Sequence, residues 1–360
     1  MTRRERVMAA VERRESDLLP VGFKATDDVL AKFKEHFAVG DVKGILASLP
    51  VDTYGTFNNC YNGIEPIYVG GPKKVLYPNT YPDGTWDSIY GYKRRWVPYG
   101  PGRNDEVITR PLGEAQTVED LDKHEWPRAD WFDFSTISQQ CRDVGDYAII
   151  YNLGGLGHAV NLIGGQRHLM AMALEPEFVG AYFDRITDFY VEFVERLLTA
   201  ADGLINIMCL HDDFGTQRGP MISLEMFRRF HKPRLKRIFD VVHSHKVKVM
   251  QHSCGACFDF IADFIEMGAD ILDPIQTTAV GVEPERLKKE FGNNIAFHGG
   301  IDTQQILVKG GPDDVRRHID ELVEGFAGAG YILAPAHFIQ ADAPFENVLA
   351  VFEHIAGLRK

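Results

Sequence analysis

Two residues with metal-binding side chains stand close together in the second half of the chain. An apolar run at 247–250 leads through Gln251 into His252, Ser253 and Cys254. Imidazole and thiolate are both good ligands for zinc, so a His-x-Cys pair is typical of a zinc site. Residues two apart in a regular strand point to the same side, and we therefore expect His252 and Cys254 to bind the same ion.

A third candidate ligand, His337, follows another apolar run at 331–333. Catalytic zinc commonly has three protein ligands and one open position. The sequence therefore predicts a catalytic zinc site formed by His252, Cys254 and His337. The alternative is that His252 is a hydrogen-bonded histidine and Cys254 a small buried residue without a metal.

These residues belong to a chain in which short apolar runs alternate with amphipathic segments. In the second half, the runs predict strands at 204–209, 247–250, 270–273, 295–298 and 331–333. The amphipathic segments between them predict helices at 223–245, 258–267, 284–291, 313–327 and 346–358. The first half fits the same plan, with strands expected at 20–23 and 147–151, helices at 29–37 and 42–49, and two helices within 168–201.

Regular alternation of strand and helix predicts parallel strands joined by crossover helices. For 360 residues, a closed (β/α)8 TIM barrel in a single domain is the simplest α/β arrangement. An open doubly wound sheet is the alternative, but no glycine-rich fingerprint follows the first strand.

Residues 64–112 interrupt the alternation because they are rich in Tyr, Trp, Gly and Pro. Turn residues at 82–84 and 101–102 predict β-hairpins inserted after the second strand. Such an insert would either form an aromatic core of its own or wall a ligand cavity, with Trp86 as a candidate substrate contact.

In a barrel of this kind, functional groups lie at the carboxyl ends of the strands. That rule selects four candidate substrate-binding residues: Asn152, His158, His211 and Gln276. It also selects Asp212, Asp213 and His337 as candidate general acids or bases. Consecutive side chains usually diverge, so at most one of the two carboxylates is expected to face the site, and helix capping is the alternative role for both.

Two loops near these strand ends have expected roles of their own. The glycine-rich loop at 154–157 could hold an anion with its backbone N–H groups, although close packing explains its glycines equally well. Asp302 is expected to cap the helix that follows it.

Composition excludes several classes of protein. With 39 Lys and Arg against 51 Asp and Glu, the formal charge is -12, which argues against a nucleic-acid partner. No apolar segment approaches the roughly 18 residues needed to span a membrane, and the amino terminus lacks the apolar region of a signal peptide. An odd count of five cysteines fits reduced thiols in the cytoplasm, and the C-x-x-C at 254–257 lacks a thioredoxin-like context.

Several motifs together resemble the uroporphyrinogen decarboxylase superfamily. They are Asp-Asp-Phe-Gly at 212–215, Lys-Pro-Arg-Leu-Lys at 232–236, His-Ser-Cys-Gly at 252–255, Gly-Gly-Ile-Asp-Thr-Gln at 299–304, Tyr-Ile-Leu-Ala-Pro-Ala-His at 331–337 and Pro-Phe-Glu-Asn-Val at 344–348. The resemblance implies the barrel fold and one of two chemistries. One branch decarboxylates uroporphyrinogen without a cofactor, and the other transfers methyl groups with a corrinoid and a zinc held by a His-x-Cys pair and a later Cys.

The decarboxylase branch carries an arginine-rich segment after the first strand, which binds the carboxylates of its substrate. Here that segment is Phe-Lys-Ala-Thr-Asp-Asp at 23–28, and one lysine beside two aspartates cannot neutralise eight carboxylates. Asp52 is a loose counterpart of the essential aspartate of that branch. The pair His252 and Cys254 instead matches the methyltransferase branch, although His337 stands where that branch has Cys.

The resemblance therefore favours a zinc-dependent methyltransferase that acts between a small methyl ether, thiol or amine and a corrinoid on a partner protein. It also implies a homodimer. The alternative is a metal-independent decarboxylase or lyase of a small carboxylic acid other than uroporphyrinogen, with His337 and an aspartate as acid and base. A third reading is a binding protein that kept the barrel and lost catalysis.

Overall fold

A curled parallel sheet forms the centre of the protein in the computed structural model, which describes residues 1–55, 63–328 and 330–359. Within those residues the sheet has seven strands, and their spatial order is their order along the chain. The strands are β1 (Thr53–Tyr54), β7 (Ala148–Gly154), β8 (Ile207–His211), β9 (Lys248–His252), β10 (Ile271–Ile275), β11 (Ala296–Ile301) and β12 (Tyr331–Pro335). Every neighbouring pair is parallel, so all carboxyl ends lie at the same end of the sheet.

The segment at 20–25 closes the sheet into a barrel. Val21 forms a parallel bridge with Leu333 of β12, and its carbonyl accepts the N–H of Asp52 at 2.8 Å, next to β1. The expected strand at 20–23 is therefore present only as bridges. Gly22 explains part of this, because a side chain there would lie 2.6 Å from the ring of His298. The expected (β/α)8 barrel is confirmed.

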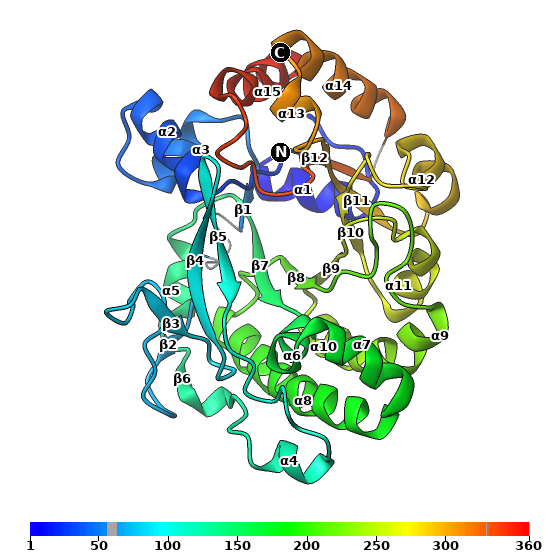
Figure 1. Ribbon diagram of the computed structural model, residues 1–360. Helices are drawn as coiled ribbons and strands as arrows, with labels where there is room; N and C mark the ends of the chain where they lie inside the picture. The colour runs from blue at the N-terminus through cyan, green and yellow to red at the C-terminus, as the bar shows by residue number, and fades with distance from the viewer. Residues whose placement is uncertain (56–62, 329, 360) are drawn as a thin grey trace.

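Helices surround the sheet (Figure 1). Those before β8 are α1 (Arg3–Val11), α2 (Asp27–Phe37), α3 (Val42–Ser48), α4 (Val118–Asp122), α5 (Ile137–Arg142), α6 (Gly157–Ile163), α7 (Gly165–Leu174) and α8 (Pro176–Ala201). Those after it are α9 (Leu224–Met226), α10 (Lys232–Ser244), α11 (Ile261–Met267), α12 (Pro284–Phe291), α13 (Ile306–Lys309), α14 (Pro312–Gly325) and α15 (Phe345–Leu358). The sequence placed α12 at its observed bounds, because a proline opens it and a glycine follows it.

Two expected helices are divided in the structure, and the one at 258–267 begins with a 3-10 turn at Phe258–Phe260 before α11. The segment at 223–245 is divided into α9, a π-helical turn at Phe227–His231 and α10. Pro233 cannot donate the N–H that an uninterrupted α-helix needs, so the chain widens to a π-turn just before it.

Apolar packing lies on both faces of the strands. The five residues of β10, the six of β11 and the five of β12 are all buried, as expected for parallel strands covered by helices. Inside the barrel, a separate apolar cluster includes Val7, Val11, Ile207 and Ile271. Helix α1 supplies the first two of these and contacts β1, β7, β11 and β12, so it closes the amino-terminal end of the barrel.

The aromatic segment holds a three-stranded antiparallel sheet of β3 (Thr85–Asp87), β4 (Lys93–Tyr99) and β5 (Gly102–Val107). On either side of this sheet in the sequence, β2 (Ile67–Tyr68) pairs with β6 (Phe132–Asp133). Figure 1 shows β4 and β5 as a long hairpin beside the barrel. Tyr99 donates a hydrogen bond to Gln340 in the loop after β12, so the hairpin reaches the carboxyl-terminal end of the barrel.

Two general expectations concern the whole chain. Among the described residues, no helix combines the length and the apolar content needed to cross a bilayer. The four cysteines that the structure describes are free thiols, whereas Cys60 lies outside the described residues.

Asp52 lies at the opposite end of the barrel from the predicted site, because it precedes β1. Its carboxylate accepts hydrogen bonds from Arg6 at 2.6 Å, from the N–H of Val21 at 2.9 Å and from Arg359. The side chain is only 1% exposed. Asp52 therefore links Arg6 and Arg359 to the amino-terminal end of the barrel. It is not a counterpart of a catalytic aspartate.

We predict that Asp52→Ala lowers the free energy of unfolding by about 3–5 kcal/mol, because it leaves two buried guanidinium groups without their shared partner. Asp17→Asn is the matched control. Asp17 also pairs with Arg6 but is 38% exposed, so its loss is expected to cost no more than about 1 kcal/mol. Urea unfolding of both variants measures the difference, and equal losses would contradict the proposed role of Asp52.

Candidate metal centre

The structure brings the three predicted metal ligands together at the carboxyl end of the barrel. His252 is the last residue of β9, Cys254 follows it by two residues, and His337 follows β12 by two residues. One ligand atom from each lies within 4.8 Å of the others, and Cys254 Sγ is 3.4 Å from His252 Nε2. Ligand atoms around tetrahedral zinc, with bonds of about 2.0–2.3 Å, stand about 3.5 Å apart. The three side chains are thus spaced for one ion.

A tight turn, not a continued strand, brings the thiol to this position. β9 ends at His252, and Cys254 then donates its N–H to Asp213 at 2.8 Å, while Gly255 donates to Gln276 at 2.8 Å. Gly255 has φ +81°, and a side chain there would lie 2.6 Å from the carbonyl oxygen of Gly215. The thiol thus reaches the imidazole through a turn after the strand, and the convergence expected for residues two apart in a strand is achieved in another way.

Asp273 fixes the orientation of His252. The two residues face each other across the β9–β10 pair, and Asp273 Oδ2 lies 2.5 Å from His252 Nδ1. Its other oxygen lies 2.5 Å from His298 Nδ1 and 3.1 Å from Lys24 Nζ. Burial raises the pKa of Asp273, but Lys24, His298 and His252 outweigh it and hold that pKa well below its usual value. A carboxylate that holds Nδ1 leaves Nε2 of His252 free to bind a metal.

Without a bound ion His252 is protonated at pH 7, and a metal ion would have to displace the proton on Nε2 to bind there. Burial alone would lower the pKa of His252, but the charges of Cys254 and Asp273 raise it to about 10. By contrast, burial, with smaller contributions from Lys24 and His252, lowers the pKa of His337 to about 4. His337 is therefore neutral at pH 7 and can offer a lone pair to an ion.

The two adjacent aspartates do different things, and both line the same cavity. Asp213 is exposed, and its Oδ1 lies 3.8 Å from His252 Nε2. Asp212 is buried and accepts the N–H groups of Leu156 at 3.1 Å and Gly157 at 2.7 Å. The expectation that only one of the pair contributes to the site was therefore wrong, because the strand ends at His211 and the turn directs both toward the cavity.

The glycine-rich loop thus binds an anion of the protein itself, the carboxylate of Asp212. A side chain at Gly155 would lie 2.0 Å from the carbonyl oxygen of His211, so close packing also requires a glycine there. Burial raises the pKa of Asp212 to about 7 despite the two N–H donors. Asp212 can therefore exchange a proton near neutral pH. Asp302 caps the turn before α13, as expected, by accepting the N–H groups of Gln304, Gln305 and Ile306.

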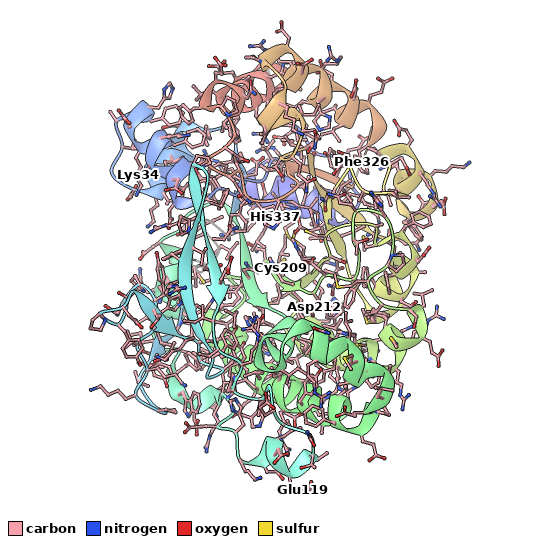
Figure 2. All side chains as sticks on the ribbon, in the orientation of Figure 1. Lys34, Glu119, Cys209, Asp212, Phe326 and His337 are labelled. Atoms are coloured by element: carbon pink, nitrogen blue, oxygen red, sulfur yellow. The ribbon has the colours of Figure 1, made fainter. Side chains whose placement is uncertain are left out.

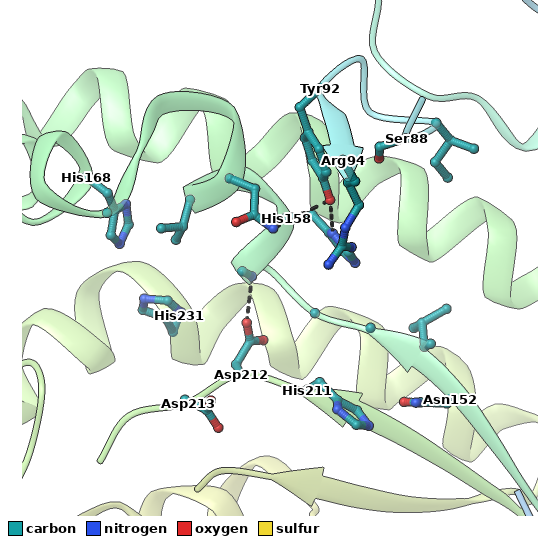
Figure 3. Close-up of a pocket in the computed structure, with 18 of the residues that line it drawn as sticks. Ser88, Tyr92, Arg94, Asn152, His158, His168, His211, Asp212, Asp213 and His231 are labelled. Carbon is teal, nitrogen blue, oxygen red and sulfur yellow. Dashed lines mark hydrogen bonds between the residues drawn. The ribbon is translucent and has the colours of Figure 1, made fainter. Parts of the chain in front are cut away.

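A cavity of about 730 Å³ lies next to His252: none of the three ligands lines it, but Asp213 and His211 do, and both contact His252. Of the predicted site residues, its lining includes Trp86, Asn152, His158, His211, Asp212 and Asp213. Figure 3 shows Asn152, His211, Asp212 and Asp213 below His158 and Arg94. His211 connects the cavity with the ligands, since its ring stacks on that of His252 at 4.3 Å. Figure 2 places Asp212 and His337 toward the middle of the molecule, whereas Lys34 and Glu119 lie at its edges.

Three of the predicted substrate contacts, Gln276, Trp86 and His158, are engaged in contacts within the protein. Gln276 does not line this cavity, because its side chain accepts the N–H of Gly255 and faces a smaller pocket of about 150 Å³ with Cys254 and His337. Trp86 is only 3% exposed because its ring packs on those of Tyr77 and Trp96. The ring of His158 stacks on Tyr90 at 4.3 Å, and its Nδ1 lies 2.7 Å from the hydroxyl of Tyr92.

Sequence reasoning missed several residues of the site. Among them are Lys24, Asp273 and His298, whose shared contact depends on a strand register that the sequence does not show. The cavity is also lined by Arg94, Asn161, His168 and His231. Of these, only Arg94 lies in the aromatic segment, for which a ligand wall was one of two expectations.

We predict that Asp273→Asn weakens zinc binding about 10–100-fold, because the amide cannot hold both imidazoles and leaves Lys24 without its counter-charge. Asp270→Asn is the matched control. Asp270 also pairs with a histidine and a lysine, His243 and Lys248, but lies before β10 at the other end of the barrel. Competition with a coloured zinc chelator measures both affinities, and wild-type affinity in the Asp273 variant would contradict the role of Asp273.

Comparison with known proteins relates this geometry to a family. Residues 138–358 match the family described as uroporphyrinogen decarboxylase (URO-D). Uroporphyrinogen decarboxylase 2, chloroplastic, of Oryza sativa subsp. japonica is 24% identical over 187 residues, which is 51% of this chain and 44% of that protein. Uroporphyrinogen decarboxylase of Hordeum vulgare is 24% identical over 191 residues, 53% of this chain and 54% of that protein. The chain spans about half the length of these curated relatives.

Among solved structures, a methyltransferase from Methanosarcina mazei has the same fold over the whole of both chains, with a TM-score of 0.69 and 17% sequence identity. The family match covers more than half of the sequence. The chain therefore belongs to the uroporphyrinogen decarboxylase family.

Proposed function

We propose that this protein is a zinc-dependent methyltransferase that moves a methyl group between a small substrate and a corrinoid carried by a partner protein. The observation that carries the proposal is the convergence of His252, Cys254 and His337 on one point beside a substrate-sized cavity. The fold shared with the methyltransferase from Methanosarcina mazei also supports it.

The donor set fits zinc. Two imidazoles and one thiolate are ligands that zinc accepts in tetrahedral sites, and Asp273 supplies the second contact that a zinc-bound histidine usually has. Related methyltransferases have a cysteine as the third ligand. His337 stands in that place here and would supply a neutral nitrogen to the ion. When bound, zinc supplies Lewis acidity that lowers the pKa of a thiol or alcohol, or polarises the oxygen of a methyl ether.

The residues around the metal centre have distinct parts in such a transfer. Asp213 lies beside His252 Nε2 and can orient the polar group of the substrate. For a methyl ether donor, the corrinoid of the partner would accept the methyl group and supply the electron pair of the new bond as the methyl–oxygen bond breaks. The oxygen keeps the electrons of the broken bond and takes up one proton. We assign this proton to Asp212, whose pKa of about 7 lets it hold a proton beside the cavity.

The cavity is not suited to uroporphyrinogen. Lys24, which stands where the decarboxylases have arginines, is 8% exposed and is already paired with Asp273. Arg94, the lining arginine of the cavity, pairs with Asp105. The charge of each cation is already balanced by an aspartate, and this favours methyl transfer over decarboxylation of that substrate.

We predict that the purified protein binds one zinc per chain, and that His252→Ala, Cys254→Ala and His337→Ala each weaken zinc binding more than about tenfold. Cys257→Ala is the matched control, because this neighbouring buried thiol is not one of the converging ligands. Metal analysis gives the zinc content, and spectroscopy of added cob(I)alamin follows methyl transfer.

Methyl transfer should stop when a chelator removes the zinc and return when zinc is restored. Full activity of metal-free wild-type protein would contradict the mechanism. Decarboxylation of a small acid in the presence of chelator, without a corrinoid, would support the alternative lyase. The corrinoid partner and a homodimer remain predictions.

A further inference from the structure

We propose that the 730 Å³ cavity binds an uncharged, saturated ring with several hydroxyl groups, such as a sugar or a cyclitol, whose methyl ether reaches the metal centre. The role of the ether rests on the proposed function, whereas the nature of the ring rests on the cavity walls. The volume lies within the range of pockets that enclose one small ligand, about 300–1,000 Å³.

The charges of the wall exclude an acidic ligand. Among the described lining residues, Arg94 is the one lysine or arginine, and its pairing with Asp105 leaves no excess positive charge. Burial lowers the pKa of His158 and His231 to about 3 and that of His168 to about 4, so these three imidazoles are neutral. A carboxylate in this cavity would lose its water without gaining a counter-ion.

Hydrogen-bonding groups lie on both sides of the cavity. Asn152 and His211 come from the ends of β7 and β8, whereas His158 of α6 and Arg94 of β4 lie across from them (Figure 3). A flat aromatic ring would turn its faces to these polar groups and leave them unpaired. A saturated ring projects hydroxyl groups toward both walls, and each hydroxyl can both donate and accept a hydrogen bond.

One end of the cavity carries a pair of histidines that no other part of the proposed mechanism uses. The rings of His168 and His231 both contact Phe183, at 5.5 and 4.8 Å, and Figure 3 shows them beside each other, away from His211 and Asn152. His168 Nδ1 is bonded to the hydroxyl of Tyr182, so Nε2 is the nitrogen left for a ligand. His231 is 6% exposed, and its Nδ1 is buried with no partner among the described residues.

The backbone around His231 is also unusual. His231 is the last residue of the π-helical turn, and such turns are frequent at functional sites. A free nitrogen of a neutral imidazole either donates or accepts, depending on the tautomer, and a polyol hydroxyl group can match it in either case. We assign His168 and His231 as the anchor for the part of the ring that lies farthest from the metal centre.

The test is calorimetric titration of the full-length protein, both chelator-treated and zinc-loaded, with a set of O-methyl hexoses and O-methyl inositols. The comparison ligands are 4-O-methylglucuronate, which is acidic, and 2-methoxyphenol, which is flat. We expect at least one O-methyl polyol to bind at millimolar concentration or below, and both comparison ligands to bind at least about tenfold more weakly.

The variants are His231→Phe, which suits the surrounding phenylalanines, and His231→Gln, which restores a hydrogen-bonding group. We expect about tenfold weaker polyol binding in the first and partial recovery in the second. The matched control is His354→Phe, a change of a surface histidine on α15 that pairs with Asp320 and should leave binding unchanged. Thermal unfolding confirms that each variant is folded.

Three results would overturn the proposal: no binding by any polyol of the set, tighter binding of either comparison ligand, or polyol binding that His231→Phe leaves unchanged. These results are separable from failure of the proposed function. Polyol binding without methyl transfer to a corrinoid contradicts the function and leaves the cavity assignment standing. Zinc-dependent methyl transfer from a thiol or amine, without polyol binding, supports the proposed function and contradicts the cavity assignment.

Discussion

The site depends on one buried carboxylate, that of Asp273. Its two oxygens contact His252, His298 and Lys24, so a single negative charge organises three groups inside the barrel. The contact with His252 follows directly from the register of β9 and β10, which sets the two residues opposite each other. A change in that register would separate the imidazole from its carboxylate and turn the ligand nitrogen away from Cys254. The geometry of the metal centre is therefore a consequence of how the parallel strands pair.

Three aspartates near the centre have different properties because their surroundings differ. Asp273 remains ionised, since cationic partners outweigh its burial. Asp212 is equally buried but has only backbone donors, so its pKa rises to about 7. Asp213 is exposed and holds the turn that carries Cys254. The same end of the barrel thus carries a fixed negative charge, a carboxyl group whose pKa is about 7 and an exposed carboxylate.

The sequence predicted the barrel and the three converging ligands because both depend on local patterns. Alternation of apolar runs with amphipathic segments indicates parallel strands, and the rule that functional groups follow such strands selected His252, Cys254 and His337. The sequence did not reveal the turn at Cys254, since a strand and a turn can both place two residues on one side. It also did not reveal Asp273 as a shared partner, because strand register arises from pairing between distant segments.

The cavity was the part least accessible to sequence reasoning. His168 lies on a helix and His231 on a π-turn, and neither belongs to a strand end, so the rule for barrels could not select them. Arg94 enters from the aromatic segment, whose position over the barrel depends on contacts such as that of Tyr99 with Gln340. The glycine-rich loop was expected to have anion-binding N–H groups, but its partner, Asp212, lies more than fifty residues away in sequence.

The central claim is that one ion is shared by His252, Cys254 and His337, and anomalous scattering at the zinc edge from crystals grown with zinc tests it most directly. The account predicts a single strong peak at bonding distance from His252 Nε2, Cys254 Sγ and a ring nitrogen of His337, with Asp273 still on the far side of the imidazole. A map without a peak between these three side chains, or with zinc held elsewhere on the chain, would contradict it.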